Sequence, residues 1–193
     1  MRTPYPCGTR NHTGPSHLGL FGYDPLKYEI GRGVLEALGL GIELTPRDVA
    51  IRGNFATVKY DGARPVIIDR RGGRIPTEEN RRMASRIRER INTIDGVKVS
   101  IASGMEHRFA LVLTFPEPLP VGADDISDTD PQKEGKSPLR PTPRRREAEA
   151  VAKVAEKFID LAAEIIRDEK AANYLLLRGF SLYPNLPSFS EAY

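Results

Sequence analysis

The spacing of hydrophobic residues changes several times along the chain, and each change indicates a different element. From residue 48, apolar side chains alternate with polar ones, which is the two-residue period of a half-buried strand. Residues 55–60 and 65–69 flank Asp61-Gly62, a dipeptide typical of tight hairpin turns. The pattern therefore predicts two antiparallel strands joined at this turn.

A spacing of three to four residues follows and predicts a helix that begins near residue 77. Thr77 is the expected N-cap, because Glu78 and Glu79 then lie in the first turn and complement the helix dipole. The expected apolar face consists of Met83, Ala84, Ile87 and Ile91, and the other faces carry Arg81, Arg82, Arg86, Arg88 and Arg90.

The rest of the chain completes an α+β pattern. Residues 97–101 and 109–113 alternate again and predict a second strand pair, while residues 116–146, rich in proline and charge, predict a long loop that is functional or disordered. Residues 148–168 show clear helical spacing, and 174–177 indicate a short buried strand. Together these elements predict a mostly antiparallel sheet with flanking helices.

The two ends of the chain give weaker signals. Asp24-Pro25 has the residues of an N-cap and a first helical position, and residues 34–38 continue with helical character. Gly39 is the expected residue just past the end of that helix. Pro184 and Pro187 predict an extended tail.

Composition excludes several classes of protein. No apolar run approaches the roughly 18 residues that a membrane span needs, and the first residues lack the apolar region of a signal peptide. The single cysteine, Cys7, cannot form an internal disulfide, so we expect a cytoplasmic protein without a membrane partner. The net charge is only +3, and the arginines between residues 64 and 90 lack interleaved aromatics, so no nucleic-acid partner is expected.

Several arginines are candidates for binding an anion. Arg70, Arg71 and Arg74 follow an expected strand, and guanidinium groups offer planar forks of donors that suit phosphate and carboxylate. The alternative is a solvated basic face, and Arg52 has the same two interpretations. Asp69 either accepts a substrate hydroxyl or holds a neighbouring arginine.

A second group of candidates lies in the loops. Thr13 and Ser16 lie in a Gly-Pro segment just before a helix start, where a hydroxyl nucleophile could meet an anion held by backbone N–H groups, although ordinary turns use the same residues. His17 is a phosphate ligand, a general acid or a structural residue, and His12 is equally open. His107 is interpreted mainly as structural. A further candidate set, which either contacts substrate or forms a salt-bridged surface loop, is Asp128, Asp130, Lys133 and Lys136.

The sequence also resembles a known family. Residues 14–25, Gly-Pro-Ser-His-Leu-Gly-Leu-Phe-Gly-Tyr-Asp-Pro, and residues 31–39 are similar to the archaeal-type cofactor-independent phosphoglycerate mutases of the alkaline-phosphatase-like superfamily. Further similar segments follow in the same order, at residues 48–57, 69–74, 127–131, 133–136, 175–179 and 186–189.

The resemblance implies a reaction and a set of site residues. Such mutases use two divalent metal ions, usually manganese, magnesium or zinc, and a hydroxyl nucleophile. The nucleophile takes the phosphoryl group of 3-phosphoglycerate and returns it to the other oxygen, giving 2-phosphoglycerate. Thr13 occupies the position of the family's nucleophilic serine, which is also a metal ligand, and the positions that match substrate-binding motifs are His17, Arg52, Asp69, Arg70 and Arg74.

The resemblance further implies an incomplete enzyme. The family's other metal ligands lie upstream and downstream of the segments found here, so we expect missing N- and C-terminal catalytic segments and no activity from this chain alone. The expected division is a partial catalytic segment with the nucleophile loop at 1–40, an inserted substrate-binding α+β domain at 41–125, and a charged loop, amphipathic helix and return segment at 126–193. The alternatives are a non-catalytic lid module that binds phosphate ligands, or a related phosphohydrolase or phosphotransferase that uses Thr13.

Overall fold

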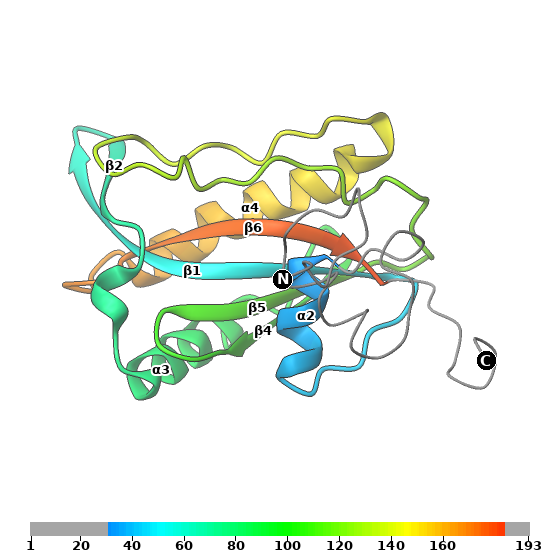
Figure 1. Cartoon of the computed structure of the whole chain (residues 1–193), viewed down its shortest axis with the longest axis horizontal. Coiled ribbons are helices and arrows are strands. Elements are labelled where there is room, and N and C mark those ends of the chain that lie inside the picture. The colour runs from blue at the N-terminus through cyan, green and yellow to red at the C-terminus, as the bar shows by residue number, and fades with distance from the viewer. Residues whose placement is uncertain (1–30, 184–193) are drawn as a thin grey trace, which may run out of the picture.

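One long strand, β1 (Asp48–Asp61), organises the computed structural model, which describes residues 31–183. It is hydrogen-bonded to three antiparallel strands in a single sheet (Figure 1). Its partners are β2 (Arg64–Asp69), β5 (Arg108–Thr114) and β6 (Tyr174–Leu182). Beyond β5 the sheet continues through β4 (Val97–Ser103) to the two-residue β3 (Thr93–Ile94).

The two faces of β1 have different surroundings because successive side chains point to opposite sides of a strand. Val49, Ile51 and Phe55 face the main core, which is covered by α3 (Thr77–Arg88) and α4 (Glu149–Ile166). In Figure 1 these two helices lie behind the sheet.

Among residues 31–183, the opposite face of β1 is covered only at its two ends. Ala50 packs beneath α2 (Arg32–Gly39), and Ala56 and Val58 belong to a separate apolar cluster farther along the strand. Figure 1 shows α2 in front of the sheet. Between these two clusters, β1 presents Arg52 and Asn54 instead of apolar residues, and this is where the candidate site lies.

The predicted α+β class and antiparallel sheet are confirmed. The Asp61-Gly62 hairpin is present, with Gly62 at φ +61°, and residues 48–61 form one continuous strand. The predicted strand at 174–177 extends to residue 182. The helix expected at 148–168 runs from 149 to 166, after a short 3-10 turn.

Two expected helix ends are wrong. Thr77 is the first helical residue rather than the N-cap, and its Oγ1 instead accepts the backbone N–H of Glu106. Pro76 takes the cap position, since its fixed backbone suits the extended conformation there. Gly39 lies inside α2, and the left-handed residue that ends this helix is Gly41, at φ +74°.

The proline-rich segment 116–146 is a long loop that packs along the outer edge of β6. Thr129 N–H donates to the carbonyl of Leu177, whose own N–H donates to Thr129 Oγ1. Later in the loop, the carbonyl of Lys136 accepts the backbone N–H of Ile67 in β2, and the carbonyl of Ile67 accepts the N–H of Gly135. The bonds with Thr129 cover part of the outer edge of β6, and those with Gly135 and Lys136 hold the loop against β2. Together they bring the acidic part of the loop beside the sheet.

Some expectations concern residues outside the described range. The helix start at Asp24-Pro25, the residues Thr13 and His17, and the tail with Pro184 and Pro187 all lie there. None of the helices between residues 31 and 183 is long and apolar enough to cross a membrane.

Candidate functional site

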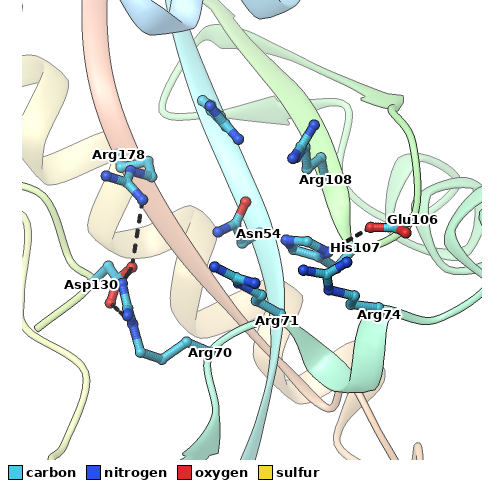
Figure 2. Close-up of a pocket in the computed structure, with 10 residues that line it drawn as sticks. Asn54, Arg70, Arg71, Arg74, Glu106, His107, Arg108, Asp130 and Arg178 are labelled. Carbon is cyan, nitrogen blue, oxygen red and sulfur yellow. Dashed lines mark hydrogen bonds and ion pairs between the residues drawn. The ribbon is translucent and has the colours of Figure 1, made fainter. Parts of the chain in front are cut away.

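A pocket of about 220 Å³ lies on the sheet face opposite α3 and α4. Its lining is dominated by arginine and comes from five separate parts of the chain (Figure 2). The lining residues are Arg52, Asn54, Arg70, Arg71, Arg74, Glu106, His107, Arg108, Asp130 and Arg178. Six arginines thus face two carboxylates, which gives the pocket a strongly positive potential.

The floor of the pocket is built by strand register. Asn54 of β1 is paired with Arg108 of β5, and Arg52 of β1 is paired with Arg178 of β6. Side chains of directly paired residues lie on the same face of a sheet. Four polar side chains from three adjacent strands therefore point toward one region that the helices described between residues 31 and 183 leave uncovered.

The rim of the pocket is a tight turn that follows β2. The Asp69 carboxylate accepts the backbone N–H groups of Arg71 and Gly73, each at 2.7 Å. Gly73 and Arg74 have positive φ angles of 70° and 50°, so the chain curls over this carboxylate. Asp69 does not line the pocket but shapes the turn that carries three arginines, and its contact with a substrate stays a prediction.

Beside the floor and the rim, the pocket has a wall that is formed by the connection between β4 and β5. Asn80 of α3 is fully buried and donates Nδ2–H bonds to the carbonyls of Glu106 at 2.5 Å and Arg108 at 2.6 Å. The hydroxyl oxygen of Thr77 accepts a hydrogen bond from the backbone N–H of Glu106 at 3.1 Å. The start of α3 thereby fixes the backbone on both sides of His107.

Burial and like charge act together on the basic groups of the floor. Burial lowers the pKa of Arg52, and Arg108 and Arg178 lower it further against the opposing effect of Glu36 at 3.5 Å. Burial also lowers the pKa of His107, and the nearby Arg108 adds to this. His107 is therefore mainly neutral at pH 7.

The long loop between β5 and α4 contributes Asp130 to the lining of the pocket. Its carboxylate accepts two hydrogen bonds from Arg70, Nε to Oδ1 and Nη2 to Oδ2, both at 2.7 Å (Figure 2). It also accepts the N–H of Gln132 and lies 3.8 Å from Nη1 of Arg178. Burial alone would raise the pKa of Asp130, but the bonds from Arg70 and Gln132 outweigh it and lower the pKa, so the carboxylate is ionised.

Polar atoms without hydrogen-bond partners are concentrated in this pocket. Within residues 31–183, six buried side-chain nitrogen or oxygen atoms lack such a partner, and five of them belong to pocket residues. Buried polar atoms in proteins are nearly always paired, so this clustering indicates a site built for a polar ligand. The five atoms are Nε of Arg52, Oδ1 of Asn54, Nδ1 of His107, Nε of Arg108 and Nε of Arg178.

The chemistry of the lining selects an anionic ligand. Guanidinium groups pair with carboxylate and phosphate oxygens in fork geometry, and a multiply charged anion relieves the repulsion among neighbouring arginines. The described residues contain no group of three histidine, cysteine, aspartate or glutamate side chains that could hold a metal ion. The pocket therefore fits anion recognition and not metal ligation.

The structure brings together part of the predicted site. Arg52, Arg70 and Arg74 line one pocket, as their interpretation as anion-binding residues requires, although Arg70 is engaged by Asp130. Thr13 and His17 lie outside the described residues.

Sequence reasoning missed several pocket residues. Asn54 could have been found from its two-residue spacing from Arg52 along β1. His107 and Arg108 lie at the start of an expected strand, which favours a structural interpretation of both, and Arg178 follows an apolar run that gives no sign of a site residue. Their roles depend on strand register, which the sequence alone does not give.

Comparison with known proteins assigns the family. The family model for 2,3-bisphosphoglycerate-independent phosphoglycerate mutase matches residues 1–172. The chain belongs to this family. A relative from Aquifex aeolicus, named as a probable mutase of this kind, is 55% identical over 193 residues, which are 100% of this chain and 47% of that protein. One from Thermosipho melanesiensis, with the same name, is 47% identical over 94% of this chain and 43% of its own length.

A solved mutase structure agrees with this assignment. The cofactor-independent phosphoglycerate mutase from Thermoplasma acidophilum superposes with a TM-score of 0.73 at 36% identity, covering 93% of this chain and 49% of that one. The resemblance noted from the sequence is thereby confirmed. The chain spans about half the length of the mutases it matches.

Proposed function

We propose that this chain supplies the substrate-binding pocket of a phosphoglycerate mutase that interconverts 3-phosphoglycerate and 2-phosphoglycerate. The observation that carries the proposal is the arginine-lined pocket in a chain of this family. Phosphoglycerate carries a phosphate and a carboxylate on a three-carbon chain, and both groups pair with guanidinium forks. Its remaining hydroxyl finds acceptors in Oδ1 of Asn54 and Nδ1 of the neutral His107, two atoms without a hydrogen-bond partner in the described part of the chain.

The arginines have a second task in a phosphoryl transfer. As the phosphoryl group leaves one oxygen, negative charge builds on that oxygen, and fixed cations nearby stabilise it. The floor residues Arg52, Arg108 and Arg178 are held by strands, so they need little rearrangement when the charge develops. We assign the nucleophile role to Thr13, which takes the phosphoryl group and returns it to the other oxygen.

The metal chemistry belongs elsewhere in the protein under this proposal. Two divalent ions would supply charge neutralisation at the attacking and leaving oxygens. No set of ligands for them is found between residues 31 and 183, so we assign the ligands to segments outside this range, and the relatives are about twice as long as this chain. We therefore expect no turnover from this chain by itself.

Calorimetric titration with 3-phosphoglycerate tests the binding part of the proposal. We expect saturable binding at low ionic strength and at least about tenfold weaker binding in Arg108→Gln and Arg178→Gln, because each substitution removes a charged hydrogen bond from the ligand. The matched control is Arg81→Gln, a loss of the same charge from an exposed side chain on α3. Equal binding by all four proteins would contradict the assignment of the pocket.

A non-catalytic binding module is the second candidate. The observation that favours it is that the described residues complete an anion pocket but include no metal-ligand cluster. A coupled assay for 2-phosphoglycerate with added manganese, on this chain and on Thr13→Ala, separates the two. Turnover that disappears in Thr13→Ala supports catalysis by this chain, binding without turnover supports a module, and release of inorganic phosphate supports a phosphohydrolase.

A further inference from the structure

One of the two carboxylates that line the pocket, that of Asp130, is already paired with one of the arginines. Asp130 takes both the Nε–H and one Nη2–H of Arg70 in a two-point contact, which is the same contact that an anionic ligand would make (Figure 2). The remaining terminal nitrogen, Nη1, is the part of this guanidinium that does not take part in the pair. A ligand can gain the full fork of Arg70 only by taking it from Asp130.

The two partners of this pair differ in how firmly they are held. The Asp130 side chain is 1% exposed, and the N–H of Gln132 fixes Oδ1. The preceding residue, Thr129, is tied to β6 by bonds in both directions with Leu177. The Arg70 side chain is 28% exposed and projects from the rim turn. Arg70 is therefore the partner that can move, and Asp130 is the fixed one.

We propose that Asp130 is an internal competitor: its carboxylate stands in the pocket as a permanent anion and holds down the affinity for phosphate- and carboxylate-bearing ligands. The choice of phosphoglycerate as the ligand rests on the proposed function, whereas the competition itself rests on the geometry of the pair. The device keeps the six arginines from binding cellular anions indiscriminately, and it lets a doubly anionic ligand, with contacts to the floor and the rim, outcompete a simple ion.

Asp130 also has an effect that favours ligand binding, because its carboxylate keeps the Arg70 side chain in place. Losing the order of one long side chain weakens binding by roughly two- to tenfold. The Asp130 carboxylate repels each negative charge of the ligand. At a separation of roughly 10 Å and an effective dielectric of about 20, this repulsion raises the dissociation constant about tenfold for each such charge. Phosphoglycerate carries more than one negative charge, and a pocket of about 220 Å³ is narrower than 10 Å. Repulsion therefore exceeds the benefit of order.

The test is the affinity of Asp130→Asn, which keeps the shape of the side chain and removes its charge. Binding of 3-phosphoglycerate is measured by calorimetry in wild type and variant at low ionic strength. The expected result is a dissociation constant at least about fivefold lower in the variant, and a difference that shrinks as added KCl screens the charges. A purely structural role for Asp130 would weaken binding instead.

Two further variants control for charge and position. Asp125→Asn removes the same charge from a residue that pairs with Arg144 and Arg145 outside the pocket, and it should leave the dissociation constant within about twofold of wild type. Asp130→Glu restores the carboxylate and should return the affinity toward that of wild type.

Loss of a buried ion pair lowers stability, so the same comparison is also made by thermal unfolding. A ligand that binds only the folded chain raises the midpoint by an amount set by its dissociation constant, even when the variant starts lower. If Asp130→Asn does not fold, Asp130→Ser removes the same charge and keeps an oxygen that can accept the Gln132 N–H.

Each outcome decides one proposal or both. Equal or weaker binding by a folded charge-removal variant overturns the competitor role and leaves the mutase proposal intact. Failure of 3-phosphoglycerate to bind, with inorganic phosphate binding more tightly to Asp130→Asn than to wild type, supports the competitor and removes support from the mutase proposal. If neither anion binds either protein, both proposals are wrong.

Discussion

The buried side-chain amide of Asn80 connects the core helix α3 to the wall of the pocket by hydrogen bonds. Asn80 lies on the inner face of α3, is 0% exposed, and donates to the carbonyls of Glu106 and Arg108. These two residues flank His107, so one side chain sets the path of the segment that forms a pocket wall. Asn80→Ala removes both bonds without adding bulk.

The two carbonyl groups that lose their Asn80 hydrogen bond in Asn80→Ala contribute different amounts to the loss of stability. The Arg108 carbonyl keeps a second donor, the N–H of Gly104 at 2.9 Å, so losing the Asn80 bond there costs about 0.5–1.5 kcal/mol. No other donor to the Glu106 carbonyl is found among the described residues, so leaving it unpaired costs about 1–3 kcal/mol. The sum predicts a loss of about 1.5–4.5 kcal/mol in the free energy of unfolding.

Urea denaturation followed by circular dichroism measures this loss. The control is Arg81→Ala, the next residue on α3, whose side chain is 67% exposed and whose loss should change stability by less than about 0.5 kcal/mol. The folded fraction of Asn80→Ala should also bind anions more weakly than wild type, because the pocket wall formed by residues 106–108 shifts. A loss below about 1 kcal/mol would refute the claim that Asn80 holds this segment.

Three other predictions concern packing and protonation. Gly53→Ala should destabilise the chain by about 2 kcal/mol or more in urea denaturation, because the added methyl would overlap the ring of Phe109. Arg82→Ala should lower the unfolding temperature at pH 7 by the equivalent of at most about 1 kcal/mol. That difference should decrease as the pH falls below about 4.5, the ordinary pKa of a glutamate, and should be lost once the pH has passed the lowered pKa of Glu169, because the bonds from Arg82 stabilise only the ionised form. His107 should titrate below pH 6.5 by proton NMR, and bound phosphoglycerate should raise its pKa by stabilising the imidazolium.

Each of these predictions has a clear opposing result. Wild-type stability in Gly53→Ala would show that the ring of Phe109 can move aside at little cost. A stability difference for Arg82→Ala that does not decrease on acidification would assign the effect to packing instead of charge. A titration midpoint for His107 above 6.5 without ligand would mean that the pocket favours the protonated ring.

The elements were easier to predict from the sequence than the site. Alternation and the Asp61-Gly62 turn located the first hairpin because a two-residue period and a turn dipeptide are local signals. Thr77 was assigned wrongly as a cap because its hydroxyl is used by Glu106, a partner far away in sequence. Local patterns carry no information about such a partner.

The arginine pocket shows the same division. Arg70 and Arg74 can be recognised from the sequence because they lie four residues apart, directly after a strand. Arg178 reaches the pocket only because β6 pairs with β1 in a register that sets it beside Arg52. Asp130 reaches it only because a proline-rich loop is tied to the edge of β6. Register and loop docking are decided by the whole fold, so the sequence pattern could not supply them.

The pairing of β1 with β6 has a consequence for how the protein is made. Val49 is among the early residues of the sheet, but its β6 partner, Leu182, leaves the ribosome on the order of ten seconds later at ordinary rates of translation. During that interval the edge of β1 that will pair with β6 exposes unpaired backbone groups. Such non-local pairing makes folding slow, and an unpaired strand edge is open to association with other chains. The protein is therefore expected to depend on chaperones most strongly just before β6 is complete.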